Sequence, residues 1–219
     1  MDLLLLALLG GLLALDGTSV GQFMVSRPLV AGVFTGWIVG DPALGLLVGG
    51  VLELFFLPAF PVGGASFPEE GPSTVVAVAT ASLAPEAGAL AVGALLAFLW
   101  ARLGAGSIRL LRRVNGRLVP DPSRGVVTAR SLVGLHVLGI GLDFLRGLLL
   151  TGTGVFLGAW LVGMLAESWP LTRPMTVGVL ALGASIPLGG LIRGLGGWRR
   201  RGLILAAGLL LFLLGSLAL

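Results

Sequence analysis

The sequence places a few ionisable side chains within long apolar stretches, where they are the residues best able to do chemistry. Glu53 lies near the centre of the apolar run 44–60. A carboxylate at the middle of a bilayer costs about 2.5–3.5 kcal/mol, so it needs a partner, a water-filled cavity or a proton. Glu53 therefore predicts either a site for a hydroxylated ligand or a structural hydrogen bond to an arginine or a backbone donor of a neighbouring subunit.

Glu69 and Glu70 form a second acidic feature, at the end of the Gly/Pro-rich connection 61–72. A long apolar run begins directly after them, at Ser73. Carboxylates at this point complement the positive N-terminal end of a helix. They could serve as capping or loop charges only, or they could accept hydrogen bonds from the hydroxyl groups of a ligand.

Gln22 and Arg27 lie in a polar break, residues 16–28, which opens with Asp16 and also contains glycines, hydroxyl side chains and a proline. These residue types interrupt a helix. Irregular backbone is tolerated at membrane depth only where it faces protein or water, and breaks of this kind often line transport sites. Gln22 and Arg27 are therefore candidate site residues.

The apolar segments on either side of this break, residues 3–15 and 29–40, are short. Thirteen helical residues span about 20 Å, whereas a membrane crossing needs about 20 residues. Two short halves around a polar centre predict a broken or re-entrant segment. It could cross the membrane once, twice or incompletely.

His136 and Arg146, together with Asp143, polarise the first half of another apolar run, residues 131–166. His136 is the only histidine, and a lone histidine more often satisfies an interior hydrogen bond than acts as a catalyst. The chain has no cysteine and no lysine, and it shows neither a phosphate-binding loop nor a metal-ligand cluster. We expect no metal, no cofactor and no catalysis by this chain alone.

Composition shows what must position these residues. Of 219 residues, 56% are hydrophobic and 11% charged, and the mean hydropathy is +1.06. Soluble domains carry about 25% charged residues, so this composition predicts an integral membrane protein. We expect an all-α, polytopic transmembrane helical bundle with broken or re-entrant segments, folded as one domain over residues 1–219. The net charge of +4 comes from arginines and gives no reason to expect a nucleic-acid partner.

Arginine-rich segments orient the predicted bundle. Seven arginines fall within about residues 101–130, and four more within 193–201, which places both segments on the cytoplasmic side. Residues 107–119 alternate arginine with apolar residues, as an amphipathic surface helix or a solvated loop would. The run 131–166 is too long for one crossing and predicts an interfacial or re-entrant helix followed by a crossing. The predicted crossings are residues 44–60, 73–100, about 147–166, 175–192 and 202–219.

Several motifs resemble a known family. Residues 22–32 (QFMVSRPLVAG), 36–42 (GWIVGDP), 45–54 (GLLVGGVLEL) and 61–65 (PVGGA) occur in this order. Together they closely resemble the N-terminal signature of IIC subunits of the mannose/fructose/sorbose family of phosphotransferase-system (PTS) permeases. The segment Phe67-Pro68-Glu69-Glu70 resembles one that usually reads Pro-Pro-Asp-Asp, and His136 and Arg146 fall where similar subunits have a His and an Arg. The resemblance is specific over about residues 15–80 and extends to about 150.

The resemblance implies a membrane-embedded sugar-translocating subunit in the bacterial cytoplasmic (inner) membrane. Such a subunit pairs with a second membrane subunit, IID, in a trimer of heterodimers, and works with cytoplasmic IIA and IIB proteins that carry phosphohistidines. The sugar crosses as a substrate-bearing core moves against a scaffold, and a IIB partner phosphorylates it at the inner face. On this interpretation sugar hydroxyls bind Gln22, Glu53, Glu69 and Glu70, with support from Asp16, Arg27, His136 and Arg146.

Two other functions fit the same residues. The chain is short for this family, which suits a transport-defective regulatory or assembly homologue. An unrelated secondary transporter could instead couple to protons through Glu53. Saturable sugar binding separates the first alternative from a permease subunit, and dependence of uptake on phosphoenolpyruvate separates the second.

Overall fold

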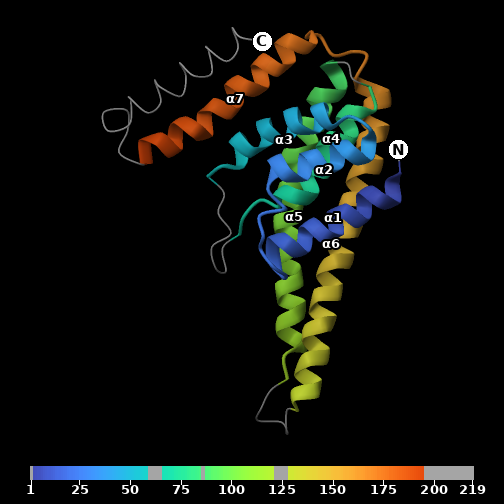
Figure 1. The fold of residues 1–219 in the computed structure, drawn as a ribbon, viewed down its shortest axis with the longest axis vertical. Coiled ribbons are helices and arrows are strands. Elements are labelled where there is room, and N and C mark those ends of the chain that lie inside the picture. The colour runs from blue at the N-terminus through green and yellow to red at the C-terminus, as the bar shows by residue number, and fades with distance from the viewer. Residues whose placement is uncertain (1, 59–65, 85–86, 121–127, 195–219) are drawn as a thin grey trace.

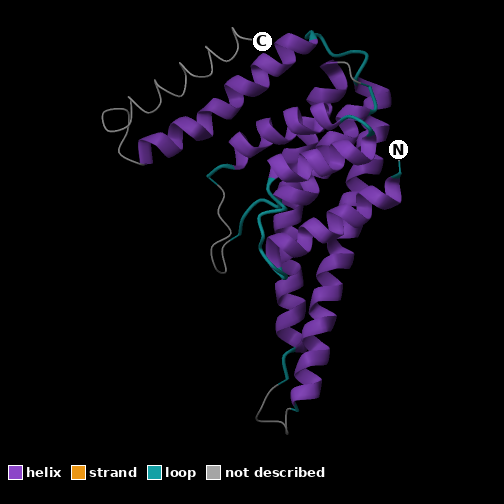
Figure 2. Cartoon of the chain, viewed as in Figure 1, coloured by secondary structure: helices purple, strands orange, loops and turns teal. Residues whose placement is uncertain are grey.

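The computed structural model describes residues 2–58, 66–84, 87–120 and 128–194, and every regular element in these ranges is a helix (Figures 1 and 2). This confirms the all-α prediction. The described residues form seven helices. They are α1 (Leu3–Thr18), α2 (Pro28–Val39), α3 (Pro42–Phe56), α4 (Glu70–Ser82), α5 (Ala87–Leu118), α6 (Ala129–Leu165) and α7 (Arg173–Gly194).

The first two helices confirm the predicted break. α1 begins after Asp2, whose carboxylate accepts hydrogen bonds from the backbone of Leu4 and Leu5 at 3.0 and 3.2 Å. α2 begins at Pro28, in the first turn where the missing N–H costs nothing, and ends at Val39, just before Gly40, whose φ of 84° is left-handed. Each helix is too short to cross a bilayer at right angles, as the sequence predicted.

α2 and α3 pack in very close contact through small residues. Gly32 and Gly36 on α2 face Gly45 and Gly49 on α3, each pair spaced four residues apart. A Cβ atom added to Gly32 or Gly45 would collide with the backbone of the opposite helix. Small residues at this spacing let membrane helices approach closely, so these glycines fix the position of α3 and hence of Glu53.

Two predicted crossings are wrong in extent. α3 ends at Phe56, two residues before Pro58, so the run 44–60 yields a helix of only 15 residues. The run 73–100 is divided between α4 and α5, and the sequence has a proline, Pro85, in the interval between them. In both places the run is apolar throughout, but the sequence contains a proline, which interrupts a helix.

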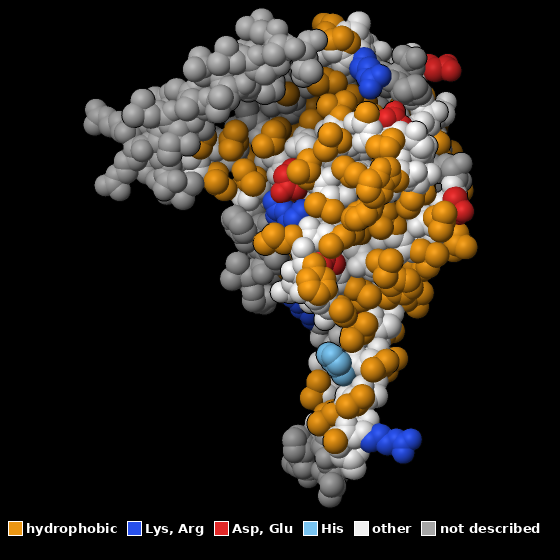
Figure 3. All heavy atoms as spheres, in the orientation of Figure 1, with side chains coloured by type: hydrophobic (Ala, Val, Ile, Leu, Met, Phe, Trp, Pro, Cys, Tyr) orange, Lys and Arg blue, Asp and Glu red, His pale blue; other side chains and the backbone are white. Residues whose placement is uncertain are grey.

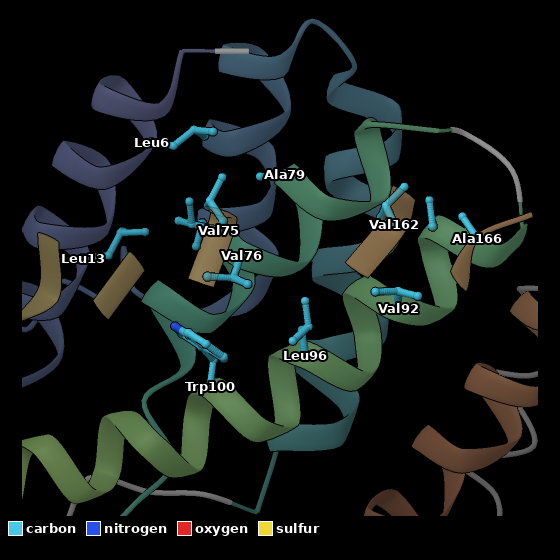
Figure 4. Close-up of a cluster of buried hydrophobic side chains, with 13 residues drawn as sticks. Leu6, Leu13, Val75, Val76, Ala79, Val92, Leu96, Trp100, Val162 and Ala166 are labelled. Carbon is cyan, nitrogen blue, oxygen red and sulfur yellow. The ribbon is translucent and has the colours of Figure 1, made fainter. Parts of the chain in front are cut away.

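α4 lies at the centre of the fold. All of its residues 71–81 are buried, and it packs against α1, α2, α3, α5 and α6. Its hydroxyl side chains donate to carbonyls of α4 itself, as when Thr80 donates to Val76 at 2.7 Å, so their burial leaves no donor unpaired. Figure 4 shows Val75, Val76 and Ala79 of α4 among apolar side chains from neighbouring elements. These include Leu6, Leu13, Val92, Leu96, Trp100, Val162 and Ala166.

α5 and α6 are longer than the sequence predicted. α5 continues through the arginine-rich residues to Leu118, so 107–119 is neither a separate surface helix nor a loop. α6 is one helix of 37 residues, not an interfacial helix followed by a crossing. The sequence has no proline in either helix, and arginine is a good helix former. Helices of 32 and 37 residues measure about 48 and 55 Å, well beyond the about 30 Å of a hydrocarbon core.

The far ends of α5 and α6 run side by side beyond the rest of the molecule (Figure 1). We call residues 109–118 and 129–140 the arm. The predicted cytoplasmic connection 101–130 is therefore mostly helix, and its Arg124 lies outside the described residues. So do the predicted crossing 202–219 and the arginines at 199–201.

Three described helices are long and apolar enough to cross a membrane: Gly88–Leu118, Ala129–Leu165 and Arg173–Arg193. α7 confirms the helix predicted over 175–192 and packs against α3 and α5. Large apolar side chains stay exposed on these helices, among them Phe156 (69%), Leu182 (72%) and Ile186 (75%). Orange apolar side chains spread over the visible face, with charged ones at only a few points (Figure 3). Such a surface suits lipid rather than water.

Candidate functional site

Arg146 of α6 holds two carboxylates from different elements. Its Nη1 and Nη2 donate to Glu69 Oε2 and Oε1 at 2.7 and 2.6 Å, a bidentate pair. Its Nε and Nη2 also donate to Asp143 Oδ1 at 3.0 and 2.8 Å. Glu69 is 4% exposed and Asp143 is fully buried. A buried charge needs this degree of pairing, because breaking such a pair costs about 3–5 kcal/mol.

Hydroxyl groups complete this network, which we call the Arg146 cluster: Glu69, Asp143, Arg146, Ser107, Thr18 and Ser19. Ser107 Oγ on α5 accepts from Arg146 Nη1 at 2.8 Å. Thr18 and Ser19, at the end of α1, donate to Asp143 Oδ2. The cluster therefore joins α1, α5 and α6 to the residue that precedes α4.

A second arginine makes a similar but more open group. Arg27, just before α2, donates from Nε to Glu53 Oε1 of α3 at 2.8 Å. Its Nη1 lies 3.2 Å from Glu70 Oε2, and the backbone N–H of Leu29 donates to Glu53 Oε2 at 3.2 Å. The side chains of Arg27 and Glu53 are 23% and 22% exposed. We call Arg27, Glu53 and Glu70 the Arg27 cluster.

The consecutive residues Glu69 and Glu70 connect the two clusters. Glu69 has extended backbone angles (φ −87°, ψ 96°), its N–H donates to Ala101 O at 3.1 Å, and Glu70 begins α4. This arrangement sends one side chain to Arg146 and the next to Arg27. The side chain of Glu69 makes no capping hydrogen bond to α4, because its carboxylate pairs with Arg146 instead. Together the clusters contain four carboxylates and two guanidinium groups, an excess of hydrogen-bond acceptors.

Asp16 acts on the site through the backbone. Its two carboxylate oxygens accept from the N–H groups of Phe23 and Ser26, each at 2.7 Å, and so fold the polar break back onto α1. Within this loop Gln22 and Met24 have left-handed φ values of 54° and 64°. Such angles cost about 1–3 kcal/mol in non-glycine residues and persist where the surroundings enforce them. The strained loop leads directly into Arg27.

A small cavity lies between the clusters, and we call it the carboxylate cavity. Its volume is about 60 Å³, enough for a few water molecules but far below the about 300 Å³ at which small-molecule pockets begin. A sugar would need the two loops that enclose this cavity to separate. The lining residues are Leu13, Gly17, Thr18, Ser26, Arg27, Phe67, Pro68, Glu69, Glu70, Gly71 and Pro72.

The structure brings together most of the predicted site residues. Arg27, Glu69 and Glu70 line the carboxylate cavity, and Glu53 and Arg146 bind these residues directly. Asp16 holds the adjoining loop, whereas the side chain of Gln22 is exposed and does not line the cavity. His136 lies in the arm, on the wall of a different cavity. The role of each residue in binding stays a prediction.

Sequence reasoning did not assign Asp143, Thr18, Ser19 or Ser107 to the site. The sequence did contain a signal for the Asp143–Arg146 ion pair. Residues three apart on a helix share a face, and these two have opposite charges within an apolar run. Thr18 and Ser19 stand in the polar break, but spacing alone does not bring that break to the middle of α6. Their contact depends on α1 crossing α6 closely at Gly10, Gly11 and Gly147.

Comparisons with known proteins agree with this architecture. A family model described as the sorbose-specific IIC component of a PTS system matches residues 1–177. A PTS system sorbose-specific EIIC component from Lacticaseibacillus casei is 35% identical over 60 residues, 27% of this chain and 22% of that protein. One from Klebsiella pneumoniae is 26% identical over 132 residues, 59% of this chain and 49% of that protein. The chain thus spans half or less of these relatives. A solved structure described as a membrane protein has the same fold, with a TM-score of 0.68, 17% identity, and coverage of 99% of this chain and 94% of that one.

Proposed function

Because the chain belongs to the sorbose-specific IIC family of the phosphotransferase system, we propose that it conducts a hexose or related sugar across the membrane. The observation that carries this proposal is the meeting of four carboxylates and two arginines beside broken helices (Glu53, Glu69, Glu70, Asp143, Arg27, Arg146). Each sugar hydroxyl both donates and accepts a hydrogen bond, so a site with carboxylates and guanidinium groups side by side suits it.

The two clusters have different roles in this proposal. Glu53 and Glu70, which are bound to the partly exposed Arg27, exchange some of these bonds for bonds to sugar hydroxyls. Glu69 stays bound to Arg146 and presents its remaining lone pairs to the cavity. Opening of the loops around residues 19–27 and 66–69 admits the sugar. Gln22, at the exposed tip of the first loop, reaches the sugar only in that open state.

The partners follow from the same family membership. We propose that residues 1–219 form one IIC domain in the bacterial inner membrane, paired with a IID subunit in a trimer of heterodimers. Cytoplasmic IIA and IIB proteins supply the phosphoryl group, and IIB transfers it to the sugar at the inner face. In this proposal the chain provides the path and is no enzyme by itself.

Phosphoenolpyruvate-dependent sugar uptake tests the proposal. Cells that express the chain with its IIA, IIB and IID partners would be assayed with L-sorbose, D-mannose and D-fructose. The Glu53→Gln and Glu70→Gln variants should lose most uptake while still reaching the membrane. Glu167→Gln, which changes an exposed carboxylate between α6 and α7, is the matched control and should transport normally. Full uptake by the Glu53 and Glu70 variants would contradict the assigned site.

One observation favours a regulatory homologue as the second candidate: the carboxylate cavity of about 60 Å³ is closed to a sugar in this conformation. A homologue without transport would show no saturable sugar binding when purified with its IID partner. The proton-coupled alternative has less support. Glu53 is held by Arg27 and by the N–H of Leu29, whereas a proton carrier in an apolar setting would need a freer carboxylate.

A further inference from the structure

A second, larger cavity lies where the arm meets the end of α1. Its volume is about 350 Å³, within the range of about 300–1,000 Å³ for small-molecule pockets. We call it the arm cavity. Its polar wall consists of Asn115 on α5, His136 on α6 and Ser19. Apolar side chains supply most of the remaining wall: Leu118, Val119, Leu132, Leu135 and Ile140.

One polar side chain on the wall of this cavity has a buried atom without a partner. Asn115 Oδ1 is buried and accepts no hydrogen bond within the described part of the chain. An unsatisfied buried acceptor is unfavourable, and in native structures it commonly indicates an absent water, ion or ligand. The residue of the facing helix opposite the Asn115 amide is Gly139, which has no side chain to pair with it; a Cβ atom there would lie 3.5 Å from Nδ2.

The other polar groups indicate what the ligand must offer. Ser19 Oγ gives its single proton to Asp143, so it can offer a ligand only an acceptor. The Asn115 side chain has an acceptor oxygen and a donor NH2 group, and His136 in its neutral form has one donor and one acceptor nitrogen. The described wall thus offers neutral donors and acceptors and contains no arginine, which suits a neutral hydroxylated molecule and disfavours a phosphate or a carboxylate. The apolar side chains suit its C–H faces.

We propose that the arm cavity is a second binding site for the unphosphorylated sugar, separate from the carboxylate cavity. The inference rests on the proposed function and specifies it further. Ser19 belongs both to the wall of the arm cavity and to the Arg146 cluster, so the two cavities are linked through one hydrogen-bonded chain. The arm carries the arginine-rich residues, so the second site lies on the side where the phosphoryl donor proteins work.

Thiol labelling can test the two sites separately, because the chain contains no cysteine. The Leu132→Cys variant places a thiol on the wall of the arm cavity, and Phe67→Cys places one on the wall of the carboxylate cavity. Val133→Cys is the matched control: Val133 neighbours Leu132 and is 63% exposed, but does not line the cavity. Each variant, assembled with its IID partner in membranes, is labelled with a maleimide at rising concentrations of L-sorbose, D-mannose or D-fructose.

We expect a saturable loss of labelling in Leu132→Cys with at least one of these sugars, and unchanged labelling in Val133→Cys. Adding Asn115→Leu removes the amide from the wall and should weaken this protection by about three- to tenfold, since one hydrogen bond contributes about 0.5–1.5 kcal/mol. Adding Asn115→Asp keeps an acceptor oxygen, so the protection from labelling should persist. Unaltered labelling of Val133→Cys in the same backgrounds shows that the arm remains folded.

The outcomes separate the second site from the proposed function. Protection in Phe67→Cys alone would overturn the arm site and leave the proposed function standing. Protection in Leu132→Cys alone would support the arm site and remove the carboxylate cavity as the sugar site. Protection in neither variant by any of the three sugars would overturn both. Labelling of Leu132→Cys that depends on the lipid and not on sugar would assign the cavity to a lipid and overturn the inference.

Discussion

The two arginine-centred clusters use the same residue types in different surroundings. In the Arg146 cluster the arginine side chain is 10% exposed and bonds two carboxylates and a serine. In the Arg27 cluster the arginine and Glu53 side chains are both more than a fifth exposed, whereas Glu70 is 11% exposed. Water can therefore replace a lost partner of Arg27 or Glu53 more readily than one in the Arg146 cluster. We therefore expect the Arg146 cluster mainly to hold helices together, and we propose that the Arg27 cluster exchanges its bonds for those of a ligand.

The largest predicted effect comes from Arg146→Met. It leaves Glu69 and Asp143 buried without their cation, which should destabilise the protein by about 3–5 kcal/mol. Thermal unfolding in detergent, followed by the loss of the monodisperse species, measures this change. An unfolding temperature equal to that of the wild type would show that the cluster does not hold the bundle together.

A smaller loss is expected from Asp143→Asn in the same cluster. The amide has one acceptor oxygen, so it can accept from Arg146 or from the hydroxyl groups of Thr18 and Ser19 but not from both, and it loses the charge that strengthens the bonds to Arg146, each contributing about 1.5–3 kcal/mol. The same unfolding measurement should place this variant between wild type and Arg146→Met. A loss greater than that of Arg146→Met would reverse the assigned order.

Arg27→Met should lower sugar affinity more than it lowers stability. Because the Arg27 and Glu53 side chains are about a fifth exposed, the removal of Arg27 should cost less stability than Arg146→Met, about 1–3 kcal/mol. Sugar affinity, measured by equilibrium binding with the IID partner present, should nevertheless fall by about tenfold or more, since hydrogen bonds to a charged group contribute about 1.5–3 kcal/mol. If Arg27→Met unfolds as easily as Arg146→Met and binds sugar normally, the two clusters do not differ as described.

The smallest effect concerns the strained loop before Arg27. Gln22→Gly introduces the residue that tolerates a φ of 54° and should stabilise the folded state by up to about 1 kcal/mol. The unfolding temperature should rise slightly. Asparagine tolerates left-handed angles better than glutamine but less well than glycine, so Gln22→Asn is the graded control and should give a smaller rise. A fall in both variants would show that the Gln22 side chain is required where it lies.

The sequence predicted the parts of the fold that local chemistry decides. Asp16 to Pro28 interrupts a helix because of its glycines and proline, and the structure has the break there. Glu53, Glu69 and Glu70 stood out because carboxylates in apolar surroundings need partners, and each has an arginine partner. Their partners come from distant positions, and no spacing in the sequence pairs Glu69 with Arg146, 77 residues away.

The lengths of α5 and α6 were predicted less well. A limit of one bilayer thickness predicts shorter helices, and arginines within an apolar chain predict connections. Helices that pack against each other along their length need not end at the membrane surface, and α5 and α6 do so. The absence of proline over these residues was the local signal that favoured long helices. The arm cavity depends on this arrangement and could not be anticipated without it.

The proposed function depends above all on the carboxylates around Arg27 binding sugar hydroxyls. The dissociation constant of a labelled sugar, measured for the chain purified with its IID partner, is the sharpest test, with Glu53→Gln compared with Glu167→Gln. We expect affinity about tenfold weaker or worse in Glu53→Gln, because each tenfold corresponds to about 1.4 kcal/mol, and no change in Glu167→Gln. Equal affinities in the two variants, at equal thermal stability, would show that Glu53 does not bind the sugar.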